Sequence, residues 1–239
     1  MVTKSELKYI QSLSDKKVRL ETGCFIAEGV KLVGEMIAAG YPLKAVYALD
    51  SWESPDTSIE VKRVEAFELE KMSLLQTPNQ VLAVAMMPQK PNAIDVTKQL
   101  TIVLDGIQDP GNLGTIIRTA DWFGIKQIVA SEDTADVYNP KVIGATMGSF
   151  MRVQVHYTNL AAWMPTVKIP VYGALLEGEN VFTTKAPKQG LLVIGSEGKG
   201  IRENIIDFIT HPVTIPKSGG AESLNAGIAA GIIVAQLTR

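Results

Sequence analysis

The chain has 239 residues, 46% of them hydrophobic and 20% charged, with a formal net charge of −2. This composition is typical of a soluble globular protein of one or two domains, and the small negative charge argues mildly against general affinity for nucleic acid. No apolar run approaches the ~18 residues of a membrane span, and the first residues lack the apolar centre of a secretion signal. The single cysteine, Cys24, excludes an intrachain disulfide and a cysteine-rich metal site, and we expect it to be buried in a strand. We therefore expect a cytoplasmic protein with no membrane partner.

The first ninety residues alternate between helical and strand-like patterns. Helical periodicity is found over residues 3–13, 28–39 and 64–75, and short apolar runs typical of strands over 24–27, 43–49 and 81–86. This alternation predicts a small α/β layer. Residues 87–92 contain two prolines and few apolar side chains, so we place a boundary there and predict domains over 1–90 and 91–239.

A locally basic stretch precedes the first predicted strand and contains Lys16, Lys17 and Arg19. Such side chains suit a surface that faces RNA, because they neutralise phosphates. They are equally common on an ordinary solvated face. The sequence leaves both interpretations open.

The remaining residues predict a second, larger α/β domain with six strands. The strands are expected at 101–105, 127–130, 152–155, 171–175, 191–195 and 213–215, and the helices at 113–123, 140–148, 160–167, 200–208 and 223–237. Leu191-Leu-Val-Ile194 is continuously apolar, as expected where helices cover both faces of a parallel sheet. We therefore expect a six-stranded, mostly parallel sheet.

The first stretch that could carry chemistry joins a predicted strand to a predicted helix, from Leu104 to Gly124. Asn112 is a good N-cap there, since its side-chain oxygen can accept from a free amide of the first helical turn. Arg118 lies six residues further on, where it could pair with Asp121 on the same helix face. From the local pattern alone, that surface pair is the simplest role for Arg118.

A second stretch, Gly195-Ser-Glu-Gly-Lys-Gly200, follows another predicted strand. Its glycines permit positive φ and close approach of a ligand, and α/β sheets bind ligands at the carboxyl ends of their strands. The Gly-x-Gly-x-x-Gly pattern of a dinucleotide site is missing after the first strand of this domain, which argues against an oxidoreductase. Glu197 is either a site carboxylate or a charge that favours the start of the following helix.

The third stretch ends the chain with a short strand, a turn from Pro216 to Gly220, and Glu222-Ser-Leu-Asn225 before the last helix. Ser223 is the expected N-cap of that helix. Three small residues would leave one side of the helix thin: Gly227, Ala230 and Gly231. The pattern fits a tightly packed terminal helix and a binding loop at a helix start equally well.

In this order and spacing, the three stretches resemble the motifs of the SpoU/TrmH family in the SPOUT superfamily. That family consists of RNA ribose 2′-O-methyltransferases that use S-adenosylmethionine, and the likeness covers residues 99–239. It implies a sheet closed by a C-terminal trefoil knot and a site without metal. By resemblance the catalytic residues are Asn112, Arg118, Glu197, Ser223 and Asn225. By the same resemblance the cofactor-binding residues are Ile194, Gly195, Gly198, Ile215, Pro216, Ser223 and Leu224.

The first domain resembles the substrate-binding domain that precedes many SpoU-type catalytic domains. The likeness is carried by Ser14–Lys17, Gly23–Val30 and Thr77–Val84. It implies binding of structured RNA, with ribosomal RNA favoured and transfer RNA possible. The SpoU/TrmH likeness, together with the small residues Gly227, Ala230 and Gly231, predicts a homodimer formed through the C-terminal domain. Two alternatives stay open: a first domain that serves dimerisation or stability, and a catalytically silent RNA-binding paralogue.

Two departures from the family pattern bear on the cofactor loop and on RNA contact. Lys217-Ser-Gly-Gly220 is rich in glycine where the family often carries bulkier residues, and Gly144 stands where many members have a basic residue. The first departure would loosen the cofactor loop. The second would remove one phosphate contact.

Overall fold

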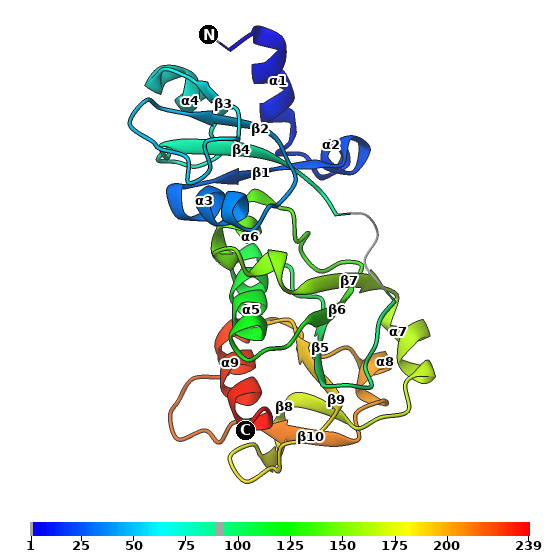
Figure 1. Cartoon of the computed structure of the whole chain (residues 1–239). Coiled ribbons are helices and arrows are strands. Elements are labelled where there is room, and N and C mark those ends of the chain that lie inside the picture. Colours follow the sequence, from blue (N-terminus) through cyan, green and yellow to red (C-terminus); the bar gives the residue numbers. More distant parts are fainter. Residues whose placement is uncertain (1, 89–92) are drawn as a thin grey trace. The chain divides into compact units, whose positions relative to one another are not determined.

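The computed structural model describes residues 2–88 and 93–239 (Figure 1). The chain forms two compact units, one of residues 1–89 and 136–151 and the other of residues 90–135 and 152–239. The boundary predicted at residue 90 falls outside the described residues, so the division of the chain there stays a prediction. The segment 136–151, which the sequence assigns to the second domain, packs with the first unit.

The first unit is built on a four-stranded mixed sheet in the order β1-β4-β2-β3. Its strands are β1 (Cys24–Glu28), β2 (Leu43–Ala48), β3 (Val61–Arg63) and β4 (Val81–Met86). Its helices are α1 (Lys4–Ser12), α2 (Lys16–Thr22), α3 (Val30–Ala38), α4 (Ala66–Met72), α6 (Pro140–Thr146) and the 3₁₀ turn Ser149–Met151. Three predicted strands are found, and the unpredicted β3 has only three residues, too few to show a period.

The two faces of this sheet bury alternate residues, as the two-residue period of a strand requires. On one face Tyr47 and Leu82 pack with residues of α1 and α4. On the other face Val46 and Ala83 pack with α3. Cys24 is buried in β1, as predicted.

Helix α2 was not predicted by its pattern, because its one buried residue is Arg19. The Arg19 guanidinium donates to the carbonyl oxygens of Leu13 and Ser14, both at 2.8 Å, and to the Asp136 carboxylate at 2.6 Å. Arg19 is only 1% exposed. Arg19 therefore belongs neither to an RNA-facing surface nor to a solvated face, while Lys16 and Lys17 do lie exposed.

An aromatic cluster joins the segment 136–151 to the rest of the first unit. Phe25 of β1 lies with its ring centroid 4.9 Å from that of Tyr138 and 5.6 Å from that of Phe150. Tyr41 packs edge-on against both Phe25 and Phe150. Burial raises the pKa of Tyr138 to about 12, which is consistent with its place in this apolar cluster.

The second unit is built on a six-stranded sheet in the order β10-β8-β9-β5-β6-β7, with every described pairing parallel. The strands are β5 (Leu100–Asp105), β6 (Gln127–Ser131), β7 (Gln154–Thr158), β8 (Val171–Asn180), β9 (Gly190–Gly195) and β10 (His211–Thr214). The expected six-stranded parallel α/β fold is confirmed, and the expected knot stays a prediction.

Helices cover both faces of this sheet (Figure 1). They are α5 (Pro110–Trp122), α7 (Leu160–Trp163), the 3₁₀ turn Met164–Thr166, α8 (Glu203–Ile206) and α9 (Ala226–Leu237). Helices α5 and α9 pack against each other. On the opposite face, Val103 and Val129 pack with residues of α7 and α8. The helices predicted over 160–167 and 200–208 are shorter than expected, the first because it gives way to the 3₁₀ turn.

Candidate functional site

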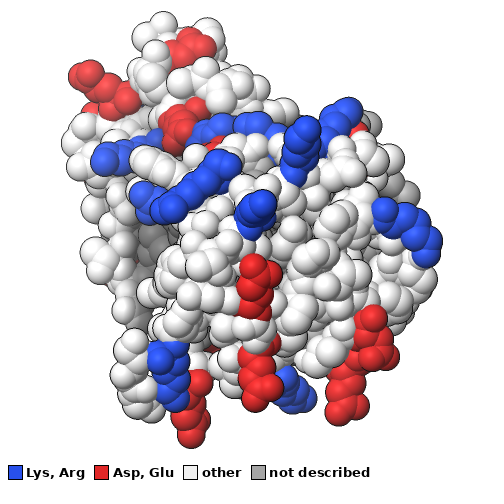
Figure 2. Space-filling model, turned by 90° about the horizontal axis from the view of Figure 1, so that it is seen from below, with Lys and Arg blue, Asp and Glu red and all other residues white. Residues whose placement is uncertain are grey.

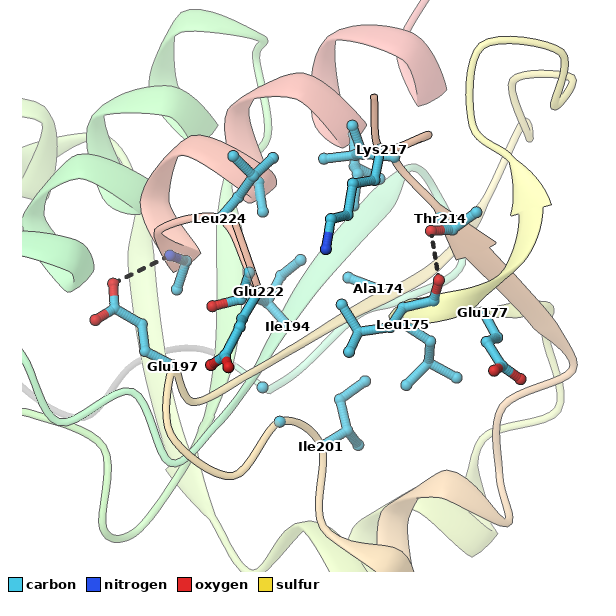
Figure 3. Close-up of a pocket in the computed structure, with 18 of the residues that line it drawn as sticks. Ala174, Leu175, Glu177, Ile194, Glu197, Ile201, Thr214, Lys217, Glu222 and Leu224 are labelled. Atoms are coloured by element: carbon cyan, nitrogen blue, oxygen red, sulfur yellow. Dashed lines mark hydrogen bonds between the residues drawn. The ribbon is translucent and has the colours of Figure 1, made fainter. Parts of the chain in front are cut away.

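A pocket of about 860 Å³ opens in the second unit, where β8, β9 and the loop after β10 meet the start of α9 (Figure 3). Its apolar lining comes from Leu175, Ile194, Ile201, Ala229 and Ile233. All seven residues predicted to bind the cofactor line it: Ile194, Gly195, Gly198, Ile215, Pro216, Ser223 and Leu224. The pocket lies at the carboxyl ends of parallel strands, where α/β sheets bind ligands.

The turn after β9 forms one wall of the pocket. Ser196 and Gly200 close it with reciprocal backbone hydrogen bonds of 3.1 and 2.9 Å. Gly195 must be glycine, because a Cβ there would lie 2.1 Å from the carbonyl carbon of Gly200. A Cβ at Gly198 would meet nothing within 4 Å. Gly195 thus allows the turn to fold back, whereas Gly198 leaves open space beside the pocket.

A hydrogen-bond network joins one residue from each of the three motifs. The Glu197 Oε1 atom accepts from Asn112 Nδ2 at 2.9 Å and from Asn225 Nδ2 at 2.5 Å. Asn225 Nδ2 also donates to Asn112 Oδ1 at 2.7 Å, and the backbone amide of Ala226 donates to Glu197 at 3.3 Å. Three residues predicted from separate parts of the sequence are therefore in direct contact. Glu197 acts here as the acceptor that fixes the starts of α5 and α9 at the pocket rim.

The caps of the two helices differ from those predicted. Asp109, not Asn112, caps α5, since its carboxylate accepts from the Asn112 amide at 2.8 Å. Asn225, not Ser223, caps α9 by accepting from the amides of Gly227 and Ile228. The helix predicted to begin at residue 223 begins at Ala226, because the side chain of Asn225 is the one that satisfies the free amides. Ser223 is left exposed in the loop.

An ion pair between the buried Asp105 and the exposed Arg202, which the sequence did not reveal, holds the turn after β9 against the end of β5. Asp105 is 1% exposed and accepts from the Arg202 backbone amide at 2.8 Å and from Arg202 Nε at 2.6 Å. Arg202 also lies 3.5 Å from Asp133. A hydrogen bond from Ser131 and the charge of Arg202 lower the pKa of Asp133. Asp105 ends β5 and lies inside the first motif, and these two features could have identified it as a site residue from the sequence.

Arg118 stands apart from these groups. It lies exposed on α5, does not line the pocket and, among the described residues, forms no hydrogen bond or ion pair. The surface pair with Asp121 is not formed, because Asp121 instead binds Arg152 at 2.8 Å. The structure thus places Asn112, Glu197 and Asn225 together, and Arg118 outside that group.

The loop from Ile215 to Leu224 is held only at its ends. Within the described parts of the chain, no backbone or side-chain group of this loop forms a hydrogen bond. Figure 3 shows Leu224 and Glu222 directed toward the pocket from this loop. Its free amides and carbonyls are therefore available to a ligand.

Residues 2–88 and 93–239 contain neither a cluster of metal ligands nor a membrane-spanning helix. No group of three or more His, Cys, Asp or Glu side chains there is placed to hold a metal ion. None of the helices described for those residues has the length and apolar character needed to cross a membrane.

Comparison with known proteins decides the family. The SpoU rRNA Methylase family matches residues 99–235, and the MRM3-like substrate binding domain matches residues 4–83. The chain belongs to the SpoU rRNA methylase family. Both resemblances found in the sequence are thereby confirmed.

Three relatives of this SpoU-family chain extend over nearly its whole length. The 23S rRNA (guanosine(2553)-2′-O)-methyltransferase RlmP of Bacillus subtilis (strain 168) is 31% identical, over 97% of this chain and 95% of the relative. The structure of a protein from Porphyromonas gingivalis assigned to the TrmH family of RNA methyltransferases is 38% identical, with a TM-score of 0.87 over 99% of this chain and 98% of the other. An AdoMet-bound rRNA methyltransferase from Sinorhizobium meliloti is 28% identical, with a TM-score of 0.87 over 99% and 95%. The expected enzyme class is confirmed at the level of the family, and the alternative of a catalytically silent paralogue gains no support.

Proposed function

We propose that this protein transfers a methyl group from S-adenosylmethionine to a ribose 2′-hydroxyl of ribosomal RNA of the large subunit. The observation that carries the proposal is the contact among Asn112, Glu197 and Asn225 at the rim of the pocket. This contact brings the three motifs of a SpoU-family chain into one site. Two of the relatives named above are described as a 23S rRNA methyltransferase and an rRNA methyltransferase, which favours ribosomal over transfer RNA. Work on ribosomal RNA agrees with the expected cytoplasmic location.

The pocket suits the cofactor in its size and lining. An adenosine with a sulfonium side chain has apolar ring faces and polar ring edges. The side chains of Leu175, Ile194 and Ile201 could cover the faces, and the unpaired backbone groups between Ile215 and Leu224 could bind the edges. When bound there, S-adenosylmethionine supplies an electrophilic methyl group.

The remaining requirements of the reaction fall on the chain's own residues. The RNA hydroxyl must be oriented toward the pocket and must lose its proton. We assign one of two roles to Arg118. It would either polarise the ribose hydroxyl or hold a neighbouring phosphate that takes the proton. A guanidinium is always protonated, so Arg118 is unsuited to act as a general base. Asn112, Glu197, Ser223 and Asn225 would then shape the rim to which the ribose binds.

Since Arg118 does not line the pocket of its own chain, we propose that two chains complete the site together. On α5, the residues Thr115, Arg118 and Trp122 are exposed at helical spacing, and Trp122 is 84% exposed. On α9, Ile228 is 55% exposed. A surface along α5 and α9 could form a homodimer and carry Arg118 to the pocket of the partner.

The small residues Gly227, Ala230 and Gly231 do not form the free side of α9 that the sequence predicts. A Cβ at Gly227 would lie 3.1 Å from Thr115 of the same chain, and Ala230 is fully buried. Two of the three small residues therefore pack within the chain, where they let α9 approach α5. Only Gly231 borders open space.

We expect Ile228→Glu to convert the dimer to a monomer, because a carboxylate would replace an apolar side chain in the interface. The new charge lies in the first turn of α9, where the helix dipole tolerates it, so the fold should persist. Light scattering at micromolar concentration measures the mass. Leu20→Glu on α2 is the matched control, since Leu20 is a 65% exposed aliphatic residue of the other unit. A monomeric wild-type chain would contradict the dimer.

The first unit is the part that we propose grips structured RNA, because it matches a substrate-binding domain. Figure 2, which views the molecule from below, shows several Lys and Arg side chains gathered across the upper half of that face, with Asp and Glu side chains above and below them. With Arg19 buried, Lys16 and Lys17 are what remains of the basic stretch as candidate phosphate contacts.

The function is tested by giving the purified protein labelled S-adenosylmethionine with ribosomal or transfer RNA from a strain that lacks this gene. We expect the label in large-subunit ribosomal RNA, at one nucleotide whose following phosphodiester resists alkaline cleavage, because a methylated 2′-oxygen cannot attack it. Label only in transfer RNA would contradict the proposed substrate. Label on a base, with no cleavage-resistant bond, would contradict the proposed reaction.

A further inference from the structure

Two lysines line the pocket among the residues that the structure describes, Lys199 and Lys217. Lys217 extends from the loop after β10, and Figure 3 shows its ammonium group directed into the pocket, on the side of Ala174 and Leu175. It forms no ion pair or hydrogen bond with any described residue. Lys217 begins the glycine-rich segment, Lys217-Ser-Gly-Gly220, that departs from the family pattern.

Lys199 belongs to a different charge environment. After the hydrogen bond from Ser131 and the charge of Arg202, the charge of Lys199 is a further cause of the lowered pKa of Asp133. The charge of Lys199 therefore acts on a carboxylate of the protein. Lys217 has no such partner, although it is directed over an apolar lining.

An ammonium group directed over apolar side chains gives up part of its hydration and gains from an anionic partner. The cofactor assigned to this pocket carries such a partner, because its amino-acid end has an α-carboxylate. We propose that Lys217 binds the α-carboxylate of the bound cofactor and thereby orders the loop from Pro216 to Ser223 over it. The inference rests on the proposed function and adds a specificity-determining residue to it.

If Lys217 contacts the carboxylate, the protein should bind two ligands that differ only in this group with different affinities. Decarboxylated S-adenosylmethionine keeps the adenosine, the sulfonium and the amine, and lacks only the carboxylate. A hydrogen bond between charged groups corresponds to about tenfold or more in affinity. The wild-type protein should therefore bind S-adenosylmethionine about tenfold more tightly than the decarboxylated form, and Lys217→Met should remove this preference.

Calorimetry on the full chain without RNA measures the four dissociation constants. Lys217→Arg keeps the charge and should restore most of the preference. Lys98→Met is the matched control, because Lys98 is an exposed lysine of the same unit that does not line the pocket, and it should retain the wild-type preference. An unchanged preference in Lys217→Met, or an equal loss of affinity for both ligands, would overturn the inference and leave the proposed function intact. If the wild-type protein bound neither ligand, the proposed cofactor site would fail as well.

Discussion

Replacing Arg118 by alanine is expected to abolish methyl transfer while leaving both the fold and the cofactor affinity nearly unchanged. The side chain is exposed and forms no pair among the described residues, so its removal should change the free energy of unfolding by under about 1 kcal/mol. It does not line the pocket of its own chain, so calorimetric affinity for S-adenosylmethionine should persist. If Arg118 polarises the ribose hydroxyl, the rate should fall by ~10²-fold or more.

Single-turnover transfer of labelled methyl to RNA measures that rate. Arg118→Lys keeps a charge and loses the planar fork, so it should retain phosphate contact better than catalysis. Lys98→Ala is the control, because Lys98 is an exposed cation of the same unit, paired with Asp95 at 2.8 Å, and should turn over normally. If Arg118→Ala transferred methyl at the wild-type rate, Arg118 would not be part of the active site.

The central strands of the second unit, β5, β6 and β9, could be predicted closely because their apolar runs are almost wholly buried. The partly exposed strands β7 and β8 were predicted with bounds that differ by several residues from the observed ones. Each residue of β5 is buried, and the predicted strand differs from the observed one by a single residue. The small helix α2 and strand β3 were missed for the opposite reason. The buried residue of α2 is an arginine, a residue type that usually lies on the surface, and β3 has three residues, two of them exposed.

The site could be predicted only in part from the sequence, because its contacts join residues far apart in the chain. Asn112 and Glu197 are 85 positions apart, and Asn112 and Asn225 are 113 apart. Motif order could predict that these residues belong to one site, and only the fold shows that they touch. The prediction that Asn112 caps α5 was wrong because Asp109 and Asn112 are both good cap residues, and the local pattern cannot distinguish them. Tertiary contact decides it, since the Asn112 side chain is engaged by Glu197.

The segment 136–151 is the clearest case in which chain order misleads. Motif spacing assigns it to the second domain, yet Asp136 binds Arg19 and Phe150 packs on Phe25. These partners lie more than a hundred residues away, so no local pattern could indicate them. We infer that the first unit needs this segment to complete its core.

Arg19→Met is therefore expected to destabilise the first unit strongly, by about 3–5 kcal/mol, the range for removing one partner of a buried ion pair. The loss would leave the Asp136 carboxylate and the carbonyl oxygens of Leu13 and Ser14 without their donor. Removing the carboxylate as well should recover part of the stability, because the double variant Arg19→Met with Asp136→Leu buries no unpaired charge.

Urea unfolding of the full chain, followed by circular dichroism, measures these differences. Lys17→Ala is the matched control on α2: its side chain is 82% exposed and pairs with Glu21 only at 3.9 Å, so its removal should change stability by under about 1 kcal/mol.

The two variants should also differ in how they bind RNA. Lys17→Ala is expected to lower the salt dependence of RNA binding if Lys17 contacts a phosphate, whereas a buried Arg19 can contribute to binding only through the fold. Equal stability of Arg19→Met and wild type would show that the pair between Arg19 and Asp136 does not hold the segment 136–151 in the first unit.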